Sequence, residues 1–253
     1  MTLTKRTLRL SLAAVPVLLA VGAGPARAQS ADEIIEKHLA AIGGREALAK
    51  LSSRAITGAM TLATPAGDVS GTVDVFAKAP NKSRTVVKMD LSAFGAGELT
   101  VDQRFDGAVG YVIDTMNGNR DITGPQLETM RQSTFPTPLL QYKETGSKAE
   151  LLGKEKIGDR DVNVVKLTPP TGFPSKQYFD AQDSMLLKIA TTVNVPQLGQ
   201  DVEQTVEFSD YRVVDGVKIA YVLKASNPLQ SYSITIKTVE HNKDIDDKSF
   251  AKP

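Results

Sequence analysis

Apolar and polar residues alternate along most of this chain from Ser53 onward, and this period of two constrains the fold more than any other feature. The first two alternating stretches cover 56–62 and 69–75, with the turn-like sequence Thr-Pro-Ala-Gly-Asp between them at 64–68. Strict alternation is typical of strands that bury one face. The chain is therefore expected to fold mainly as antiparallel β-sheet.

Further stretches of strand-like composition predict that this sheet is large. They lie at 84–91, 99–105, 109–114, 149–157, 162–168, 176–180, 185–193, 204–211, 217–225 and 232–240. Asp106-Gly107 and Asp215-Gly216 each separate two of them and favour two-residue hairpin loops. An antiparallel sheet of roughly ten or more strands tends to curl or close rather than stay flat.

A helical segment is predicted ahead of the strands. Ser30 and Glu33 have the spacing of a capping box, and apolar residues at helical spacing follow them. Gly43-Gly44 is suited to ending this helix, and a short second helix is expected at 45–51.

The middle of the chain also departs from the strand pattern. Gly124-Pro125 opens a helical stretch, since proline suits the first position of a helix. The segment 134–142 is rich in large apolar residues and is expected to be irregular or briefly helical. We therefore predict a mainly β (α+β) fold, in which helices cover one face of a curved antiparallel sheet.

The first 28 residues have the plan of a secretory signal peptide. A basic start is followed by an apolar run of about a dozen residues and then by Ala26-Arg27-Ala28. The apolar run is short for a membrane-spanning helix, which needs about 20 residues, so an uncleaved anchor is the weaker alternative. We expect cleavage after Ala28, a single mature domain at 29–253, and export to a periplasm-like space. No cysteine follows the apolar run, so no lipid can be attached there.

Composition excludes several kinds of function. Without the four basic residues of 1–28, the chain has 26 Lys and Arg against 29 Asp and Glu, which gives no support for nucleic-acid binding. The absence of cysteine excludes a thiol nucleophile and a cysteine-based zinc site. No cofactor is expected.

Motifs for catalysis are also missing. The sequence has no phosphate-binding glycine loop, no G-x-S-x-G nucleophile elbow and no H-E-x-x-H metal motif. Only His38 and His241 could serve as a histidine base, and a dispersed Ser-His-Asp site stays open as the minor alternative. The stretch 114–121 is superficially similar to a calcium loop but lacks the EF-hand spacing, so a hairpin turn is the better interpretation.

The remaining notable feature is a set of large apolar residues that belong to no catalytic motif. It can form a packed core, or it can line a cavity between a curled sheet and its covering helices. Flexible glycine and proline residues around residues 124–142, the middle segment, would let that segment act as a lid. The residues expected to line the cavity or lid are Val73, Val75, Leu99, Val101, Tyr111, Met130, Phe135, Leu139, Leu140 and Leu187.

Several segments resemble, in order, exported outer-membrane lipoprotein-sorting-like proteins of the LolA/LolB-like superfamily. The resemblance rests on Asp32 to Leu48, Phe105-Asp106-Gly107 with Gly110-Tyr111, Leu152 to Asp161 leading into Val164 to Leu167, Tyr178-Phe179-Asp180 with Met185-Leu186-Leu187, and Phe208 to Tyr211 with Val214 to Val217. The sequence departs from the family at Tyr111, where such chains often have Trp. No arginine here is matched to the one that holds the lid in true carriers.

The resemblance implies an incomplete antiparallel barrel whose open side is covered by helices. It also implies a non-catalytic periplasmic carrier or binder, whose partners are lipid or lipoprotein acyl chains and an envelope protein. The alternative is a structural or interaction module of the cell envelope with a filled interior.

Overall fold

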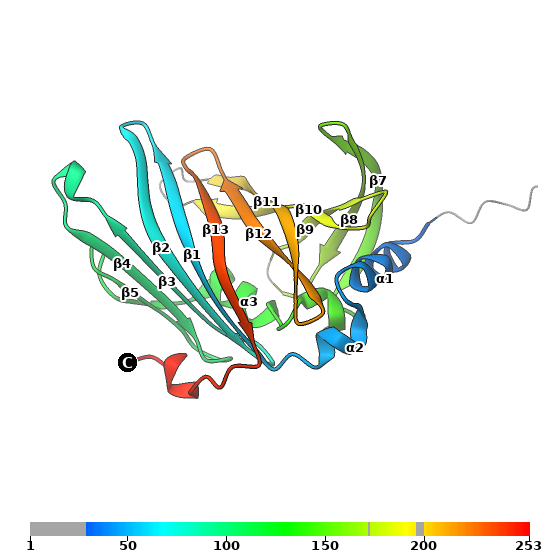
Figure 1. Ribbon diagram of the computed structural model, residues 1–253, viewed down its shortest axis with the longest axis horizontal. Helices are drawn as coiled ribbons and strands as arrows, with labels where there is room; N and C mark the ends of the chain where they lie inside the picture. The colour runs from blue at the N-terminus through cyan, green and yellow to red at the C-terminus, as the bar shows by residue number, and fades with distance from the viewer. Residues whose placement is uncertain (1–28, 172, 196–199) are drawn as a thin grey trace, which may run out of the picture.

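The computed structural model describes residues 29–171, 173–195 and 200–253 (Figure 1). The predicted signal peptide lies outside the described residues. Two helices, α1 (Ala31–Ala41) and α2 (Gly44–Ala49), precede the sheet, and α3 (Gly124–Gln132) lies in the middle of the chain. Short 3-10 helices occur at η1 (Ser92–Phe94), η2 (Pro138–Gln141) and η4 (Asp247–Ser249).

Within the described residues, thirteen strands form one antiparallel sheet that does not close into a barrel. The strands are β1 (Ser53–Thr64), β2 (Gly67–Lys78), β3 (Lys82–Asp90), β4 (Glu98–Phe105), β5 (Gly110–Asp114), β6 (Arg120–Ile122), β7 (Lys148–Ile157), β8 (Arg160–Thr168), β9 (Ser175–Asp180), β10 (Leu186–Val195), β11 (Gln200–Val214), β12 (Val217–Ser226) and β13 (Ser231–His241). The predicted incomplete barrel is confirmed.

The strand order explains why the middle of the chain covers the sheet. All neighbours are consecutive in sequence except β1 and β13, which pair with each other at the centre. The two edges are therefore β6 and β7, which are also consecutive in sequence. Because one connection must run from edge to edge, α3 and η2 cross the open side of the curved sheet (Figure 1).

Local signals at the first helix and at one hairpin are confirmed. The Ser30 hydroxyl accepts a hydrogen bond from the Glu33 amide at 3.1 Å, and the Glu33 carboxylate accepts one from the Ser30 amide. Asp215-Gly216 is a two-residue loop in which both residues have positive φ, as the tightest hairpins require.

The hairpin at Asp106-Gly107 has a longer loop than predicted. Phe105 pairs with Gly110, so four residues, 106–109, make the turn. The Asp106 carboxylate accepts hydrogen bonds from the amides of Ala108 and Val109, and this local capping stabilises the longer loop.

Two apolar clusters make up the interior. The larger joins α1, α2 and η2 to strands β7–β12, and its fully enclosed members include Ile35, Leu39 and Phe179. The smaller consists of Met60, Val69, Val73 and Met89, with half-buried neighbours from β3, β4 and β13. The helices thus fill one half of the concave face, where the candidate site lies.

Candidate ligand cavity

A cavity of about 250 Å³ lies between the covering helices and the central strands. Most of its walls are apolar. The lining residues are His38, Ile42, Leu48, Arg54, Ile56, Pro136, Thr137, Leu186, Phe208, Tyr211, Val217, Lys218, Ile219, Ala220, Leu223 and Ile236.

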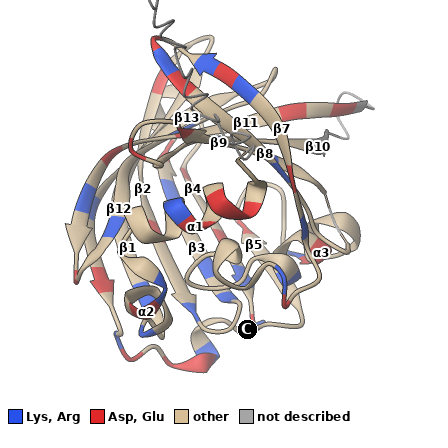
Figure 2. Ribbon diagram, turned by 90° about the vertical axis from the view of Figure 1, so that its right-hand side faces the viewer, with Lys and Arg blue, Asp and Glu red and all other residues tan. Residues whose placement is uncertain are grey.

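The cover of this cavity comes from α1, α2 and the segment before η2. Figure 2 shows α1 lying in the opening that the curved strands surround. The end of α1 is fixed to the sheet, because the Lys218 amide donates a hydrogen bond to the Ile42 carbonyl at 2.9 Å. A Cβ atom on Gly43 would lie 2.6 Å from the Gly216 carbonyl oxygen, and φ there is +130°, so only glycine fits this close approach.

Two cationic residues line the cavity, Arg54 at the start of β1 and Lys218 on β12, and Lys218 is the exposed one. Arg54 is half-buried, and burial lowers the pKa of its guanidinium to about 10, so the group stays protonated at neutral pH. Its Nε donates a hydrogen bond to His241 Nε2 at 3.1 Å. Its guanidinium carbon lies 5.3 Å from the centroid of the Phe135 ring, within the range of a cation–π contact.

His241 is held in turn by Asp215. Its Nδ1 lies 3.2 Å from Asp215 Oδ2, and its side chain is only 1% exposed. Because Nε2 accepts from Arg54, the proton of the neutral ring belongs on Nδ1, where it is donated to the carboxylate. Burial and the positive charge of Arg54 lower the pKa of His241, although Asp215 opposes this. The arrangement is a linear chain from Asp215 through His241 to Arg54.

His38 also lines the cavity, from α1. Its Nδ1 lies 3.0 Å from the Ser184 carbonyl oxygen and donates to it, and its ring is 5.0 Å from that of Phe179. Burial lowers the pKa of His38 to about 4. The ring is therefore neutral at neutral pH and joins the cover to the loop before β10.

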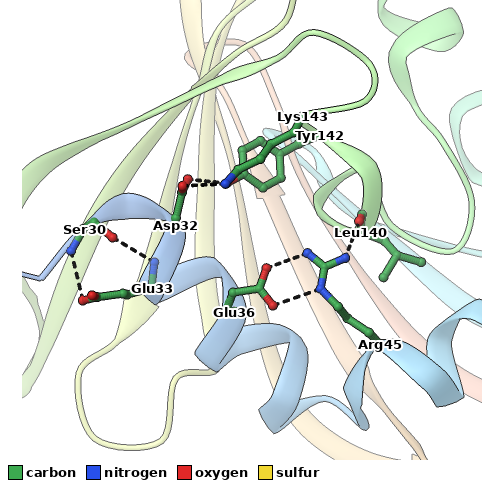
Figure 3. A network of polar contacts seen from close by, with 8 residues as sticks. All are labelled: Ser30, Asp32, Glu33, Glu36, Arg45, Leu140, Tyr142 and Lys143. Atoms are coloured by element: carbon green, nitrogen blue, oxygen red, sulfur yellow. Dashed lines mark hydrogen bonds and ion pairs between the residues drawn. The ribbon is translucent and has the colours of Figure 1, made fainter.

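Polar contacts at the surface join α1 and α2 to the middle segment (Figure 3). Asp32 accepts hydrogen bonds from the Tyr142 hydroxyl and from Lys143 Nζ. Arg45 donates to the Glu36 carboxylate through two nitrogens and to the Leu140 carbonyl at 2.8 Å. These contacts hold the parts of the cover to one another.

The predicted ligand residues lie around this cavity rather than in its wall. Leu139, Leu140 and Leu187 are buried in the larger cluster. Phe135 packs against the same cluster and lies beneath Arg54, and its neighbours Pro136 and Thr137 line the cavity. Met130 is half-buried on α3.

The other predicted residues belong to the first strands. Val73, Val75 and Leu99 are in the smaller cluster, and Val101 pairs with Val87 on the same face. Tyr111 lies on the other face, where Lys252 Nζ is 4.5 Å from its ring centroid. The sequence pattern placed it inward, whereas its neighbours Gly110 and Val112 take the inward positions by alternation.

Sequence reasoning missed Arg54 and the outward position of Tyr111. The signal for Arg54 was available: it lies two residues before Ile56, so alternation points both side chains to the same face of β1. What the sequence could not give is the partner His241, which is 187 residues away.

The described residues contain neither a cluster of metal ligands nor a serine hydroxyl bonded to a histidine. In the described part of the chain, no group of three or more His, Cys, Asp or Glu could hold a metal ion. Among the same residues, no serine hydroxyl bonds to either histidine, since His38 contacts only the backbone carbonyl of Ser184. In the predicted turn after β5, the Asp114 carboxylate accepts from the amides of Met116 and Asn117.

The architecture of a curved, unclosed antiparallel sheet with helices in its opening defines the chain as having a LolA-like fold, and the comparisons agree. It is similar to a LolA superfamily protein from Nitrosomonas europaea, at 16% identity and a TM-score of 0.57 over 89% of this chain and 99% of that one. It is also similar to a DUF1329 family protein from Desulfovibrio piger, at 12% identity and a TM-score of 0.57 over 87% of this chain and 95% of that one. A third similar structure is a putative outer membrane lipoprotein-sorting protein domain from Vibrio parahaemolyticus, at 14% identity and a TM-score of 0.56 over 87% of this chain and 95% of that one.

At these identities the likeness concerns the fold. No family model and no curated protein matches the sequence. None of the helices in the described residues has the length and apolar character needed to span a membrane.

Proposed function

We propose that this chain is a non-catalytic periplasmic binder or carrier of an apolar chain, such as a lipid or lipoprotein acyl group. The observation that carries the proposal is the apolar cavity under a cover built from separate pieces of chain. Binding sites for small apolar ligands are concave and mostly apolar, with few polar groups. The fold shared with a putative lipoprotein-sorting domain supports the same class of cargo.

A long bound chain would need more room than the cavity provides, so the proposal includes movement of the cover. The cavity has a volume of about 250 Å³, just below the ~300–1,000 Å³ of typical ligand sites. Its apolar surface continues along the strands, however, because Ile236 lies opposite Gly58 and the next inward pair on these strands is Met60 and Ile234. We propose that a bound chain extends from the cavity toward the smaller cluster when the middle segment shifts.

The cover is suited to such movement. Its ion pairs are exposed at the surface, where such pairs contribute little to stability because water and salt screen them. Breaking these contacts between the middle segment and α1 therefore costs little free energy. The apolar contacts beneath them oppose the separation. Transfer of cargo to an envelope partner would follow opening, with no covalent step. Export with removal of the signal peptide after Ala28 completes the proposal.

Native mass spectrometry of the protein purified from its own envelope fraction tests the proposal. The expected result is a co-purified lipid that leaves on denaturation. In a second arm, a fluorescent apolar probe such as 1-N-phenylnaphthylamine is expected to bind the purified protein. Leu223→Gln, in the cavity wall, should weaken the probe several-fold, while the matched change Val213→Gln at an exposed position of β11 should not.

A filled structural module of the envelope is the second candidate, and the tight packing of Leu139, Leu140 and Tyr142 in the cover favours it. This candidate predicts no co-purified lipid and no probe binding. Those two results together would contradict the carrier proposal.

A further inference from the structure

Arg54 places a half-buried positive charge in the cavity wall without a carboxylate in direct contact. None of the residues that line the cavity is Asp or Glu. In the described part of the chain, no carboxylate forms an ion pair with Arg54, whereas Arg84, Arg104 and Arg160 each have one. Placing a cation away from water without a counter-charge is costly, so this position needs an explanation.

The guanidinium of Arg54 has a fixed orientation, but only one of its three nitrogens donates a hydrogen bond to a described residue. Nε is committed to His241, and one face of the group lies over the Phe135 ring. No hydrogen bond joins Nη1 or Nη2 to another described residue. Guanidinium donors form a rigid fork that matches the two oxygens of a carboxylate or phosphate. The unused end of Arg54 is thus suited to an oxyanion.

Neighbouring groups fix this orientation. Asp215 sets the tautomer of His241, and His241 then accepts from Nε, which limits rotation of the guanidinium. Asp215 is itself exposed, and its carboxylate is held by His241 Nδ1 on the far side of the ring from Arg54. It therefore positions Arg54 through the ring without neutralising it directly.

We propose that Arg54 binds the anionic group of an amphiphilic ligand, so that the cargo is an apolar chain ending in a carboxylate or a phosphate rather than a neutral lipid. This inference rests on the proposed function and names its ligand class. The anionic oxygens would contact Nη1 and Nη2, and the chain would extend past Ile56 and Ile236 toward Met60.

The test compares decanoate, decyl phosphate and 1-decanol, which share one alkyl chain, by isothermal titration calorimetry at neutral pH. Wild type is expected to bind at least one of the anions about tenfold or more tightly than the alcohol, because a hydrogen bond to a charged group is worth that much. The two anions distinguish a carboxylate from a phosphate headgroup. Arg54→Gln should remove the preference while leaving decanol binding within about twofold.

Arg212→Gln is the matched control. Arg212 also lies over an aromatic ring, that of Tyr221, but it is exposed, pairs with Asp210 and does not line the cavity. Its substitution should leave all three affinities unchanged. Should Arg54→Gln fold poorly, Arg54→Lys keeps the charge without the fork and is expected to retain a reduced preference.

Equal binding of anions and alcohol by wild type would overturn this inference and leave the carrier proposal intact. A change of all three affinities by the same factor in Arg54→Gln would also overturn it, since Arg54 would then act on the cover through Phe135. Failure of every probe to bind wild type would instead remove the proposed function itself.

Discussion

Arg54 and His241 face each other across the central pair of strands, with Nε of one 3.1 Å from Nε2 of the other. They stand near the start of β1 and at the end of β13, so this hydrogen bond adds a side-chain contact to the ladder between the first and last strands in the sequence. Arg54 lines the cavity, so this contact also orients the half-buried charge there.

Replacing His241 with leucine is expected to destabilise the protein by about 1–3 kcal/mol, since Arg54 Nε and Asp215 both lose their partner. His241→Gln, which retains an acceptor and a donor, should cost less. Urea denaturation followed by circular dichroism measures both variants. Equal stability of the leucine variant and wild type would show that the Asp215–His241–Arg54 chain contributes nothing to the fold.

Stability should fall as the pH falls below about 6.5 because His38 is buried in its neutral form. Its pKa is about 4 in the folded protein and about 6.5 in the unfolded chain, so the unfolded state binds more protons between these values. The stabilisation is fully present above pH 6.5, and at pH 5 about 2 kcal/mol of it is lost. The lowered pKa of His241 acts in the same direction.

His38→Asn separates the contribution of this residue from that of the many carboxylates. Asparagine can place a donor near the position of Nδ1, toward the Ser184 carbonyl, but it does not titrate. We expect the variant to be less stable at neutral pH, since the ring leaves a void beside Phe179, and to lose less stability between pH 7 and pH 5. Urea midpoints at the two pH values give the comparison, and an unchanged slope with pH would contradict the assignment.

Period-two alternation and strand-like composition predicted every strand except β6, because they reflect local burial of alternate residues, and β6 has only three residues. The capping box of Ser30 and Glu33 and the loop at Asp215 were equally predictable, since each depends on a few adjacent residues. Alternation does not state which strands pair, so the junction of β1 with β13 could not be read from it. Tyr111 shows a further limit: an aromatic residue in a strand can pack on either face, and here Lys252 from the C-terminal tail covers it.

Arg45→Ala is expected to loosen the cover with little effect on global stability. Its ion pair with Glu36 is about half-exposed, so its loss should cost less than about 1 kcal/mol. The hydrogen bond to the Leu140 carbonyl is lost as well, which frees the middle segment locally. Hydrogen–deuterium exchange should therefore become faster at 138–145 and remain unchanged in β1 and β13.

Lys50→Ala is the control for that measurement. Lys50, the residue that follows α2, pairs with Glu46 at the surface, and no hydrogen bond or ion pair joins it to the described residues of the middle segment. Exchange in the middle segment should match wild type. Faster exchange in both variants would mean that any loss of charge on α2 or its end destabilises the cover, which would count against a specific role of Arg45.

Substitutions at Leu139 distinguish a cavity wall from a packed core. Leu139 is 3% exposed and belongs to the larger apolar cluster, so Leu139→Ala should cost about 2–5 kcal/mol by removing buried surface and leaving a void. Probe binding should then fall only as far as the folded fraction falls. Leu223→Ala, in the cavity wall and half-buried, should show the opposite balance, with weaker binding at a smaller loss of stability. Urea denaturation and probe titration of the two variants measure this balance. If both variants lose binding in the same proportion to their loss of stability, the cavity wall and the packed core are not distinct here.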